Sequence, residues 1–205
     1  MDAGSAELRV LGCLIEKQRT TPDVYPLSLN ALRAACNQTT NRDPVVEYDE
    51  DTVRSALRRL EQRRWVRLAS GRGSRAVKFR HLLDEALGIG EPELALLAVL
   101  MLRGAQTGGE LKARAERLHP FASLAEVHET LDRMIERELA VRLPRGPGQK
   151  EERYRQLLGG EEEIGTTAAD VAPAGDLEAR VERLEAEVAS LRRVVGTPPD
   201  SESPY

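Results

Sequence analysis

The segment ELRVLGCLIEK, residues 7–17, recurs without a gap as ELALLAVLMLR at residues 93–103. In each copy a second helical stretch follows, and then a third whose apolar residues have the same spacing. The third stretches align through Val53, Leu57, Leu60 and Trp65 in the first copy and Val127, Leu131, Met134 and Leu139 in the second. An internal repeat of this kind sets the number of domains before any motif is weighed.

Each copy ends in two short extended runs around a Gly-containing turn. VRL at 66–68 precedes GRGSRAVKF at 71–79, and VRL at 141–143 precedes RGPGQKEERYRQLL at 145–158. Three helices followed by a β-hairpin is the order of a winged helix, a helix-turn-helix with a two-stranded wing. We therefore predict a mainly α-helical protein with small β-hairpins, built as two tandem winged-helix domains over residues 5–86 and 90–158.

Capping signals mark the starts of several predicted helices. Ser28 is a candidate N-cap for a helix over residues 29–36, and the acids at 49–51 suit the positive end of a third helix. In the second copy, Thr107–Glu110 and Ser123–Glu126 both have the spacing of a capping box. These signals predict where the helices of each domain begin.

The C-terminal part of the chain has a different character. Residues 159–175, GGEEEIGTTAADVAPAG, are a flexible linker by composition. Residues 176–195 then carry a heptad pattern with Val at a and Leu at d, which favours parallel two-stranded coiled coils: Leu177, Val181, Leu184, Val188, Leu191 and Val195. We predict a coiled-coil helix that forms a homodimer through residues 177–195, with a disordered tail at 196–205. The alternative is that this stripe folds back on the chain's own domains.

Length and composition indicate a cytoplasmic protein of two small domains. With seven aromatic residues among 205, the cores must be built from Leu, Val, Ala and Ile. The first residues, MDAGSAELR, lack the basic start and apolar run of a signal peptide. The longest apolar stretch, residues 94–102, has nine residues against the roughly 20 of a membrane span, so we expect a buried helix there and no membrane association.

The net charge of −4 is unevenly distributed. Residues 54–80 carry ten Lys or Arg and a single acid, a net charge of +9, while residues 90–158 are neutral and residues 159–205 carry a net charge of −7. The sequence thus predicts a basic face on the first domain and an acidic C-terminal end.

The sequence gives little support to catalysis or metal binding. Cys13 and Cys36 each lie on the apolar face of a predicted helix, where small buried side chains are the favoured interpretation. A disulfide is not expected without an export signal, and the three histidines lie far from both cysteines. No Gly-rich phosphate loop follows a strand, and no nucleophile–base constellation is recognisable. We expect neither an enzyme nor a cofactor.

The basic face makes double-stranded DNA the leading candidate partner. If the apolar residues of the third helix are buried, a rotation of about 100° per residue directs Ser55, Arg58, Arg59 and Gln62 outward. These side chains can contact base edges and phosphates in a major groove, and the wing adds three bases, Arg72, Arg75 and Lys78. The first domain is therefore predicted to bind DNA, as a transcription regulator does. The alternative is a solvated basic face, and the acids at 49–51 would repel phosphate unless the helix docks along its middle.

A polar loop next to this helix has two interpretations. The stretch NQTTNR, residues 37–42, is either held by its own side-chain-to-backbone hydrogen bonds or is a recognition loop. In the second case its candidate contacts are Asn37, Gln38, Asn41 and Arg42.

The second domain does not look like a second DNA reader. The same projection directs four acids outward, Glu126, Glu129, Asp132 and Glu136, and these would be repelled by DNA. The alternative function is therefore a protein-interaction adaptor built from winged helices, with no direct role at DNA.

Three segments carry a family resemblance. GCLIEKQRTTPDVYPLSLNALRAACNQTTNRDPV at 12–45, LRGAQTGGEL at 102–111 and DLEARVERLEAEV at 176–188 together resemble the bacterial YceH-like family. The resemblance covers nearly the whole chain and implies a pair of winged-helix domains with a C-terminal helix. It implies no activity and no functional residues. The tandem arrangement is also similar to the chromosome segregation and condensation protein B, at the level of the fold alone.

Overall fold

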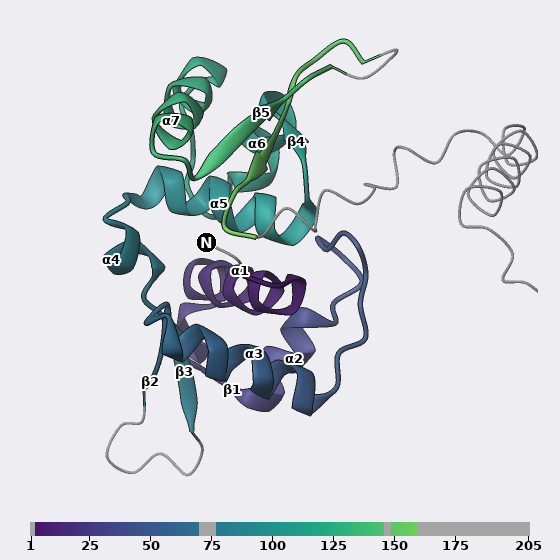
Figure 1. The fold of residues 1–205 in the computed structure, drawn as a ribbon, viewed down its shortest axis with the longest axis vertical. Coiled ribbons are helices and arrows are strands. Elements are labelled where there is room, and N and C mark those ends of the chain that lie inside the picture. The colour runs from purple at the N-terminus through teal and green to yellow at the C-terminus, as the bar shows by residue number, and fades with distance from the viewer. Residues whose placement is uncertain (1–2, 70–76, 146–148, 160–205) are drawn as a thin grey trace, which may run out of the picture. The chain divides into compact units, whose positions relative to one another are not determined.

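The structure, a computed structural model, describes residues 3–69, 77–145 and 149–159. These residues form a mainly helical protein with two small antiparallel sheets (Figure 1). The first half contains α1 (Ser5–Thr20), the 3-10 turn η1 (Pro22–Val24), β1 (Leu27–Ser28), α2 (Leu29–Cys36), α3 (Glu50–Gln62), β2 (Val66–Leu68) and β3 (Lys78–His81). After α4 (Leu83–Leu87), the second half contains α5 (Glu91–Arg103), β4 (Gln106–Thr107), α6 (Gly108–Ala115), α7 (Leu124–Glu136), β5 (Ala140–Leu143) and β6 (Arg153–Gln156).

The two halves share one topology. In each half a short strand joins the first two helices and pairs with the last strand, so the strand orders are β1-β3-β2 and β4-β6-β5. All pairs are antiparallel, with Leu68 opposite Phe79 in the first half and Leu143 opposite Arg153 in the second. The two extended runs expected after residues 65 and 140 are therefore paired strands, and the repeat seen in the sequence is a repeat in space.

Side-chain caps fix the helix starts. Ser28 Oγ accepts from the Ala31 amide at 3.3 Å, and the Thr107–Glu110 capping box is complete, at 3.2 Å and 2.9 Å. At α7 only half of the predicted capping box forms. Ser123 Oγ accepts from the Glu126 amide, but the Glu126 carboxylate accepts from the Ala122 amide at 2.7 Å. The carboxylate therefore satisfies the backbone donor one residue before the N-cap.

Several elements escape prediction because they are short. β1 and β4 have two residues each, too few to show the alternation that marks a strand. The short helix α4 ends at Gly88, which adopts the left-handed conformation with a φ of 59°. α1 also extends beyond the repeated segment, residues 7–17, at both ends.

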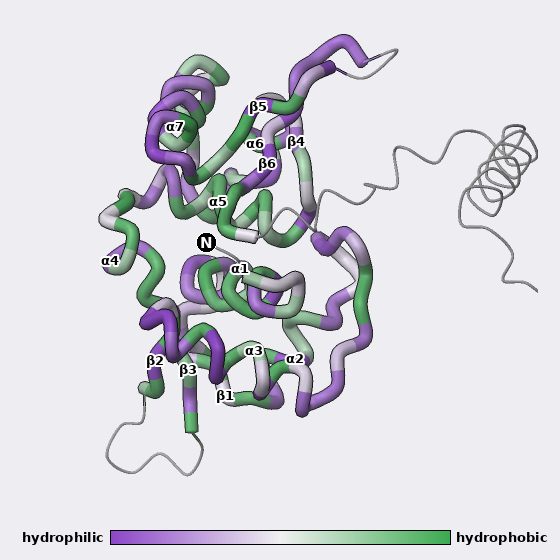
Figure 2. Tube along the Cα trace, viewed as in Figure 1, coloured by the Kyte–Doolittle hydropathy of each residue, from purple (hydrophilic) through white to green (hydrophobic). Residues whose placement is uncertain are grey.

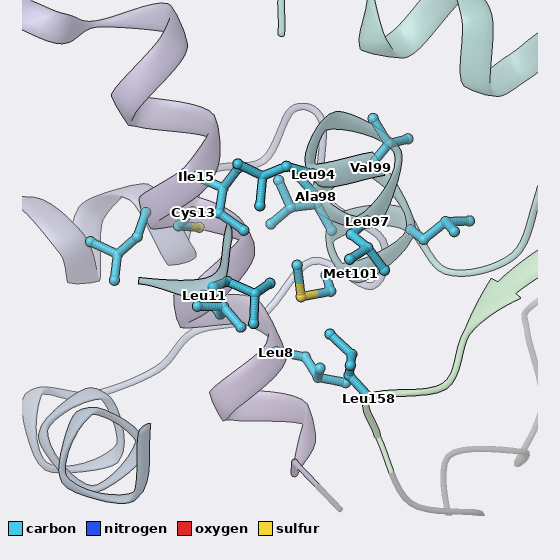
Figure 3. Close-up of a cluster of buried hydrophobic side chains, with 14 of the residues drawn as sticks. Leu8, Leu11, Cys13, Ile15, Leu94, Leu97, Ala98, Val99, Met101 and Leu158 are labelled. Carbon is cyan, nitrogen blue, oxygen red and sulfur yellow. The ribbon is translucent and has the colours of Figure 1, made fainter. Parts of the chain in front are cut away.

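The two halves are joined through one apolar core in which α1 packs against α5. Leu8, Leu11 and Ile15 of α1 face Leu94, Leu97 and Met101 of α5 (Figure 3). All nine residues of the predicted buried stretch 94–102 are indeed buried, because α5 contacts α1 as well as α6, α7 and β6. Figure 2 shows the resulting concentration of hydrophobic residues along both helices.

Gly12 sets the spacing of this contact. A Cβ added to Gly12 would lie 2.9 Å from Leu102 Cγ and 3.3 Å from Met101 Cβ, so the missing side chain is what lets α1 and α5 approach. The core of one half is therefore completed by the first helix of the other.

Among the described residues, no helix is long and apolar enough to span a membrane. The predicted linker at 159–175, apart from Gly159, lies outside the described residues, as do the coiled-coil helix at 176–195 and the tail at 196–205.

Candidate nucleic-acid interface

The predicted surface of α3 has the expected exposure. Val53, Leu57 and Leu60 are buried, whereas Arg58 and Gln62 are exposed and Ser55 is half-buried. Arg58 Nη2 donates to Ser55 Oγ at 2.8 Å, which orients the guanidinium along the helix surface. The middle of α3 thus presents an arginine for which the described residues supply no carboxylate partner.

The acids at the start of α3 are engaged locally. Asp49 is the N-cap, and its Oδ1 accepts from the Thr52 amide at 2.8 Å. The hydrogen bonds from Thr52 lower the pKa of Asp49, so its carboxylate stays charged. Glu50 forms an ion pair with Arg54 one turn later. Apart from the half-buried Glu61 in the last turn, the acids of α3 therefore lie at its N-cap and in its first turn.

Arg59 has a role that its outward position does not reveal. Its Nε donates to Oε1 of Glu7 on α1, and Arg63 Nε lies 3.6 Å from Glu7 Oε2. The Glu7 side chain is 4% exposed and that of Arg59 is 55% exposed, so a nearly buried carboxylate lies beneath the surface arginine. Removing Arg59 would leave that charge with weaker compensation, and we therefore assign Arg59 first to the fold.

The same ion pair occurs in the second half. Arg133 of α7 lies 3.3 Å, Nε to Oε1, from Glu93 of α5. In the internal repeat, Glu93 corresponds to Glu7 and Arg133 to Arg59. An ion pair between the first and third helices is thus part of the repeated structure.

The exposed positions around this ion pair differ in charge between the halves. By the same alignment, Ser55, Arg58 and Gln62 of α3 correspond to Glu129, Asp132 and Glu136 of α7, all three of which are exposed. Asp132 is partly neutralised by Arg142, at 3.0 Å. One shared backbone therefore presents a neutral-to-basic helix face in the first half and an acidic one in the second.

The sheet of the first half adds further positive charge. Arg64, which follows α3 with a φ of 60°, and Arg67 of β2 are exposed. Lys78 of β3 is half-buried and lies opposite Ser28 of β1. The side chains of Leu68 and Val77 are exposed. Arg72 and Arg75 of the predicted wing lie outside the described residues.

The polar loop at 37–42 is built around a buried arginine. The side chain of Arg42 is fully buried and donates from Nη1 and Nη2 to the two oxygens of Glu16, at 3.0 Å and 2.6 Å. Arg42 also donates to the carbonyl of Ala35 at 3.1 Å and to Gln38 Oε1 at 3.0 Å. Burial raises the pKa of Glu16, but the hydrogen bond and charge of Arg42 outweigh burial and lower it overall.

The two asparagines of the loop also form hydrogen bonds within the protein. Asn37 forms a pair of hydrogen bonds with the backbone of Tyr48, at 2.8 Å and 2.9 Å, and Asn41, with a φ of 61°, accepts from Arg103 of α5. These contacts account for the amide-rich composition through the structure of the loop itself. The structure thus favours the first interpretation of this loop, in which Asn37, Gln38, Asn41 and Arg42 hold the loop itself and are not DNA contacts.

Sequence reasoning missed two features of this region. The Glu7–Arg59 pair joins residues 52 positions apart, and no local pattern signals it. The basic residues just after α3 contribute to the charge of residues 54–80, but the sequence does not single them out as DNA contacts. Among the described residues, no cluster of His, Cys, Asp and Glu could hold a metal ion.

Comparison with known proteins places the chain in a family. Residues 4–149 match the model of a protein of unknown function, DUF480. A UPF0502 protein of Pelobacter propionicus is 49% identical over 203 residues, covering 95% of this chain and 92% of the relative. The family model includes Glu7, Arg42 and Arg59, whose contacts hold the first half together, and it covers most of the second half. We conclude that this chain belongs to the DUF480 family.

Proposed function

We propose that the protein binds double-stranded DNA through a winged helix formed by its first half, in the manner of a transcription regulator. The observation that carries this proposal is the charge difference between equivalent helices. The exposed middle of α3 presents Arg58 where α7 presents Asp132. The ion pair between the first and third helices occurs in both halves, whereas this difference in surface charge is not required by the fold.

The arrangement around α3 suits a helix that lies in a major groove. Arg58 and Gln62 are long side chains able to hydrogen bond to base edges and phosphates. Arg64 and Arg67 follow at the end of the helix and on β2, where phosphates flanking the groove would lie. Because the acids other than the half-buried Glu61 lie at the start of α3, the helix would dock through its middle and C-terminal turns.

Titration of a fluorescently labelled duplex with the full chain tests this proposal. Binding should weaken linearly with the logarithm of salt concentration, and Arg58→Ala and Arg67→Ala should each reduce the slope by about one. Arg117→Ala, which removes an exposed arginine of the second half, is the matched control and should leave the slope unchanged. No binding at low salt, or equal effects of Arg58→Ala and Arg117→Ala, would contradict the proposal.

A second candidate function rests on the acidic face of α7. Glu129 and Glu136 are exposed at positions equivalent to Ser55 and Gln62, so the second half suits a basic protein surface better than a nucleic acid. Affinity capture from nuclease-treated bacterial lysate should then retain a protein partner, and Glu129→Lys with Glu136→Lys should release it. Loss of all partners after nuclease treatment would favour DNA binding alone.

We also propose the homodimer predicted by the heptads of residues 177–195. A two-fold pair would present two α3 helices to paired half-sites on DNA. Mass measurement in solution should give a dimer for the full chain and a monomer after truncation at Gly175. A full-length chain that is still monomeric at tens of micromolar would rule out all but weak pairing. A dissociation constant of that size corresponds to roughly −6 to −7 kcal/mol.

A further inference from the structure

The sheet of the first half carries an apolar row that continues beyond the core. Leu27, Phe79 and Leu68 lie opposite one another on β1, β3 and β2, so their side chains share one face of the sheet. Leu27 is buried and Phe79 is half-buried, but Leu68 is 54% exposed. Val77, two residues before Phe79, falls on the same face by the alternation of side chains along a strand, and it is 52% exposed. The described ends of β2 and β3 are accordingly hydrophobic (Figure 2).

The second half has no such row. The residues at the equivalent strand positions are Gln106, Tyr154 and Arg142. The Arg142 guanidinium lies over the Tyr154 ring, 5.7 Å from its centroid, and also pairs with Asp132 and Glu152. Tyr154 is therefore buried beneath a charged side chain that has its own partners. The exposed apolar row belongs to the first half alone, which is also the half with the basic face.

The opposite face of the same strands is basic. Arg67 of β2 lies directly opposite Arg80 of β3, and Lys78 falls on that face two residues earlier. Arg80 pairs with Glu85 at 2.7 Å, whereas the described residues provide no carboxylate for Arg67 or Lys78. Like charges directly opposite each other on paired strands are destabilising. An anion bound beside Arg67 would therefore stabilise this part of the sheet.

An apolar strip beside unpaired cations suits a groove of duplex DNA. The deoxyribose rings along the minor groove have apolar edges, and phosphates run beside them. A second copy of this chain fits less well, because it would bring one basic surface against another, and residues 54–80 carry a net charge of +9. A strip of a few side chains is also far smaller than the roughly 800 Å² per partner that a stable protein interface buries.

We propose that Leu68, Phe79 and Val77 pack against deoxyribose rings in the minor groove that adjoins the major groove bound by α3. This proposal rests on the DNA binding proposed above and adds an apolar contact to it. β2 begins at Val66, shortly after α3 ends at Gln62, so both elements can reach one duplex. An apolar contact displaces no counterions, and its contribution to affinity is therefore independent of salt, unlike that of a contact with phosphate.

Titration of a labelled duplex with the full chain at several salt concentrations tests the proposal. Leu68→Ala and Val77→Ala should each weaken binding by roughly 3- to 10-fold at every salt concentration and leave the salt slope unchanged. Arg67→Ala, in contrast, should reduce the slope by about one. Leu124→Ala is the matched control, because Leu124 is a leucine of the second half that is 45% exposed, and its replacement should not change the affinity.

Two further measurements separate the contact from an effect on folding. Leu68→Met keeps an apolar side chain of similar volume and should retain the wild-type affinity. Hydroxyl-radical cleavage of the bound duplex should show deoxyriboses protected across a minor groove by the wild type, and this protection should be lost with Leu68→Ala and Val77→Ala combined. Circular dichroism of the same variants should match that of the wild type, because both side chains are exposed.

The possible failures of this proposal and of DNA binding itself are distinguishable. Equal affinities of Leu68→Ala and Leu124→Ala, a changed salt slope, or unchanged cleavage would overturn the role of the strip and leave DNA binding by α3 intact. Leu68→Ala that leaves DNA affinity unchanged but converts a dimeric chain to a monomer would assign the strip to an interface between copies. A wild-type chain that binds no duplex would overturn both proposals.

Discussion

At the scale of single residues, exposure was predictable but partners were not. The apolar spacing of α3 correctly places Arg58, Arg59 and Gln62 on its surface. It cannot show that Arg59 binds Glu7, because that contact depends on how α1 crosses α3. Arg42 shows the same limit, since its polar sequence neighbours indicate an exposed loop and its side chain is fully buried.

The buried side chain of His81 should make folding stability depend on pH. His81 is 2% exposed, with Nε2 at 2.5 Å from Gln18 Oε1 and Nδ1 without a hydrogen bond. Burial, opposed by Asp84 and reinforced by the charges of Arg80 and Arg19, lowers the pKa of His81 to about 4. The folded state therefore favours the neutral ring.

Folding stability should accordingly fall in acid. The unfolded chain binds a proton at His81 below an ordinary pKa of roughly 6.5, whereas the folded chain resists protonation until about pH 4. The contribution of His81 to the free energy of unfolding is fully present above the pKa of the unfolded chain. It is lost as pH falls through this window, by roughly 3 kcal/mol in all. Urea unfolding at pH 7 and pH 5 should show a larger loss for wild type than for His81→Gln. Equal losses would show that other groups govern the acid response.

At the scale of elements, the sequence predicts the helices well because their signals are local. Caps such as Ser28 and Thr107 act within one turn, and the buried stripe of each helix is visible in its spacing. The two-residue strands β1 and β4 exist only because β3 and β6 supply partners from far along the chain. A strand that depends on its neighbour for every hydrogen bond leaves no local pattern.

The close approach of α1 and α5 at Gly12 should make the fold sensitive to a larger side chain at this position. Gly12→Val should destabilise the fold by about 1–3 kcal/mol, because the new side chain overlaps Leu102 and forces the helices apart. Gly109→Val is the matched control: Gly109 lies in the first turn of α6, where an added Cβ meets no atom closer than Thr107 Oγ1 at 4.0 Å. Thermal unfolding of both variants measures the difference, and equal shifts would mean that the helices can adjust their spacing.

At the scale of the whole molecule, the repeat was visible in the sequence but the union of its halves was not. Complete burial of residues 94–102 was predicted from their apolar run, yet nothing in the run says that α1 is one of the covering elements. Two domains in sequence are, within the described residues, one continuous core.

This shared core predicts a single unfolding transition. Trp65, the only tryptophan, is 5% exposed in the first half, so its fluorescence follows that half alone. Far-ultraviolet circular dichroism follows the helices of both halves. The two signals should change at the same urea concentration. A fluorescence transition that precedes the loss of helix would show that the first half unfolds independently.

The duplicated ion pair has a consequence for mutational mapping of any binding surface. An alanine scan would score Arg59 as an energetic hot spot even if it touched no ligand, because the variant loses folded protein as well as a cation. Arg133 offers an internal standard for that artefact. Its replacement removes the equivalent contact with Glu93 from the half that carries no basic face. The loss of binding caused by Arg59→Ala, minus the loss caused by Arg133→Ala, separates a direct contact with the ligand from an effect on folding within one chain.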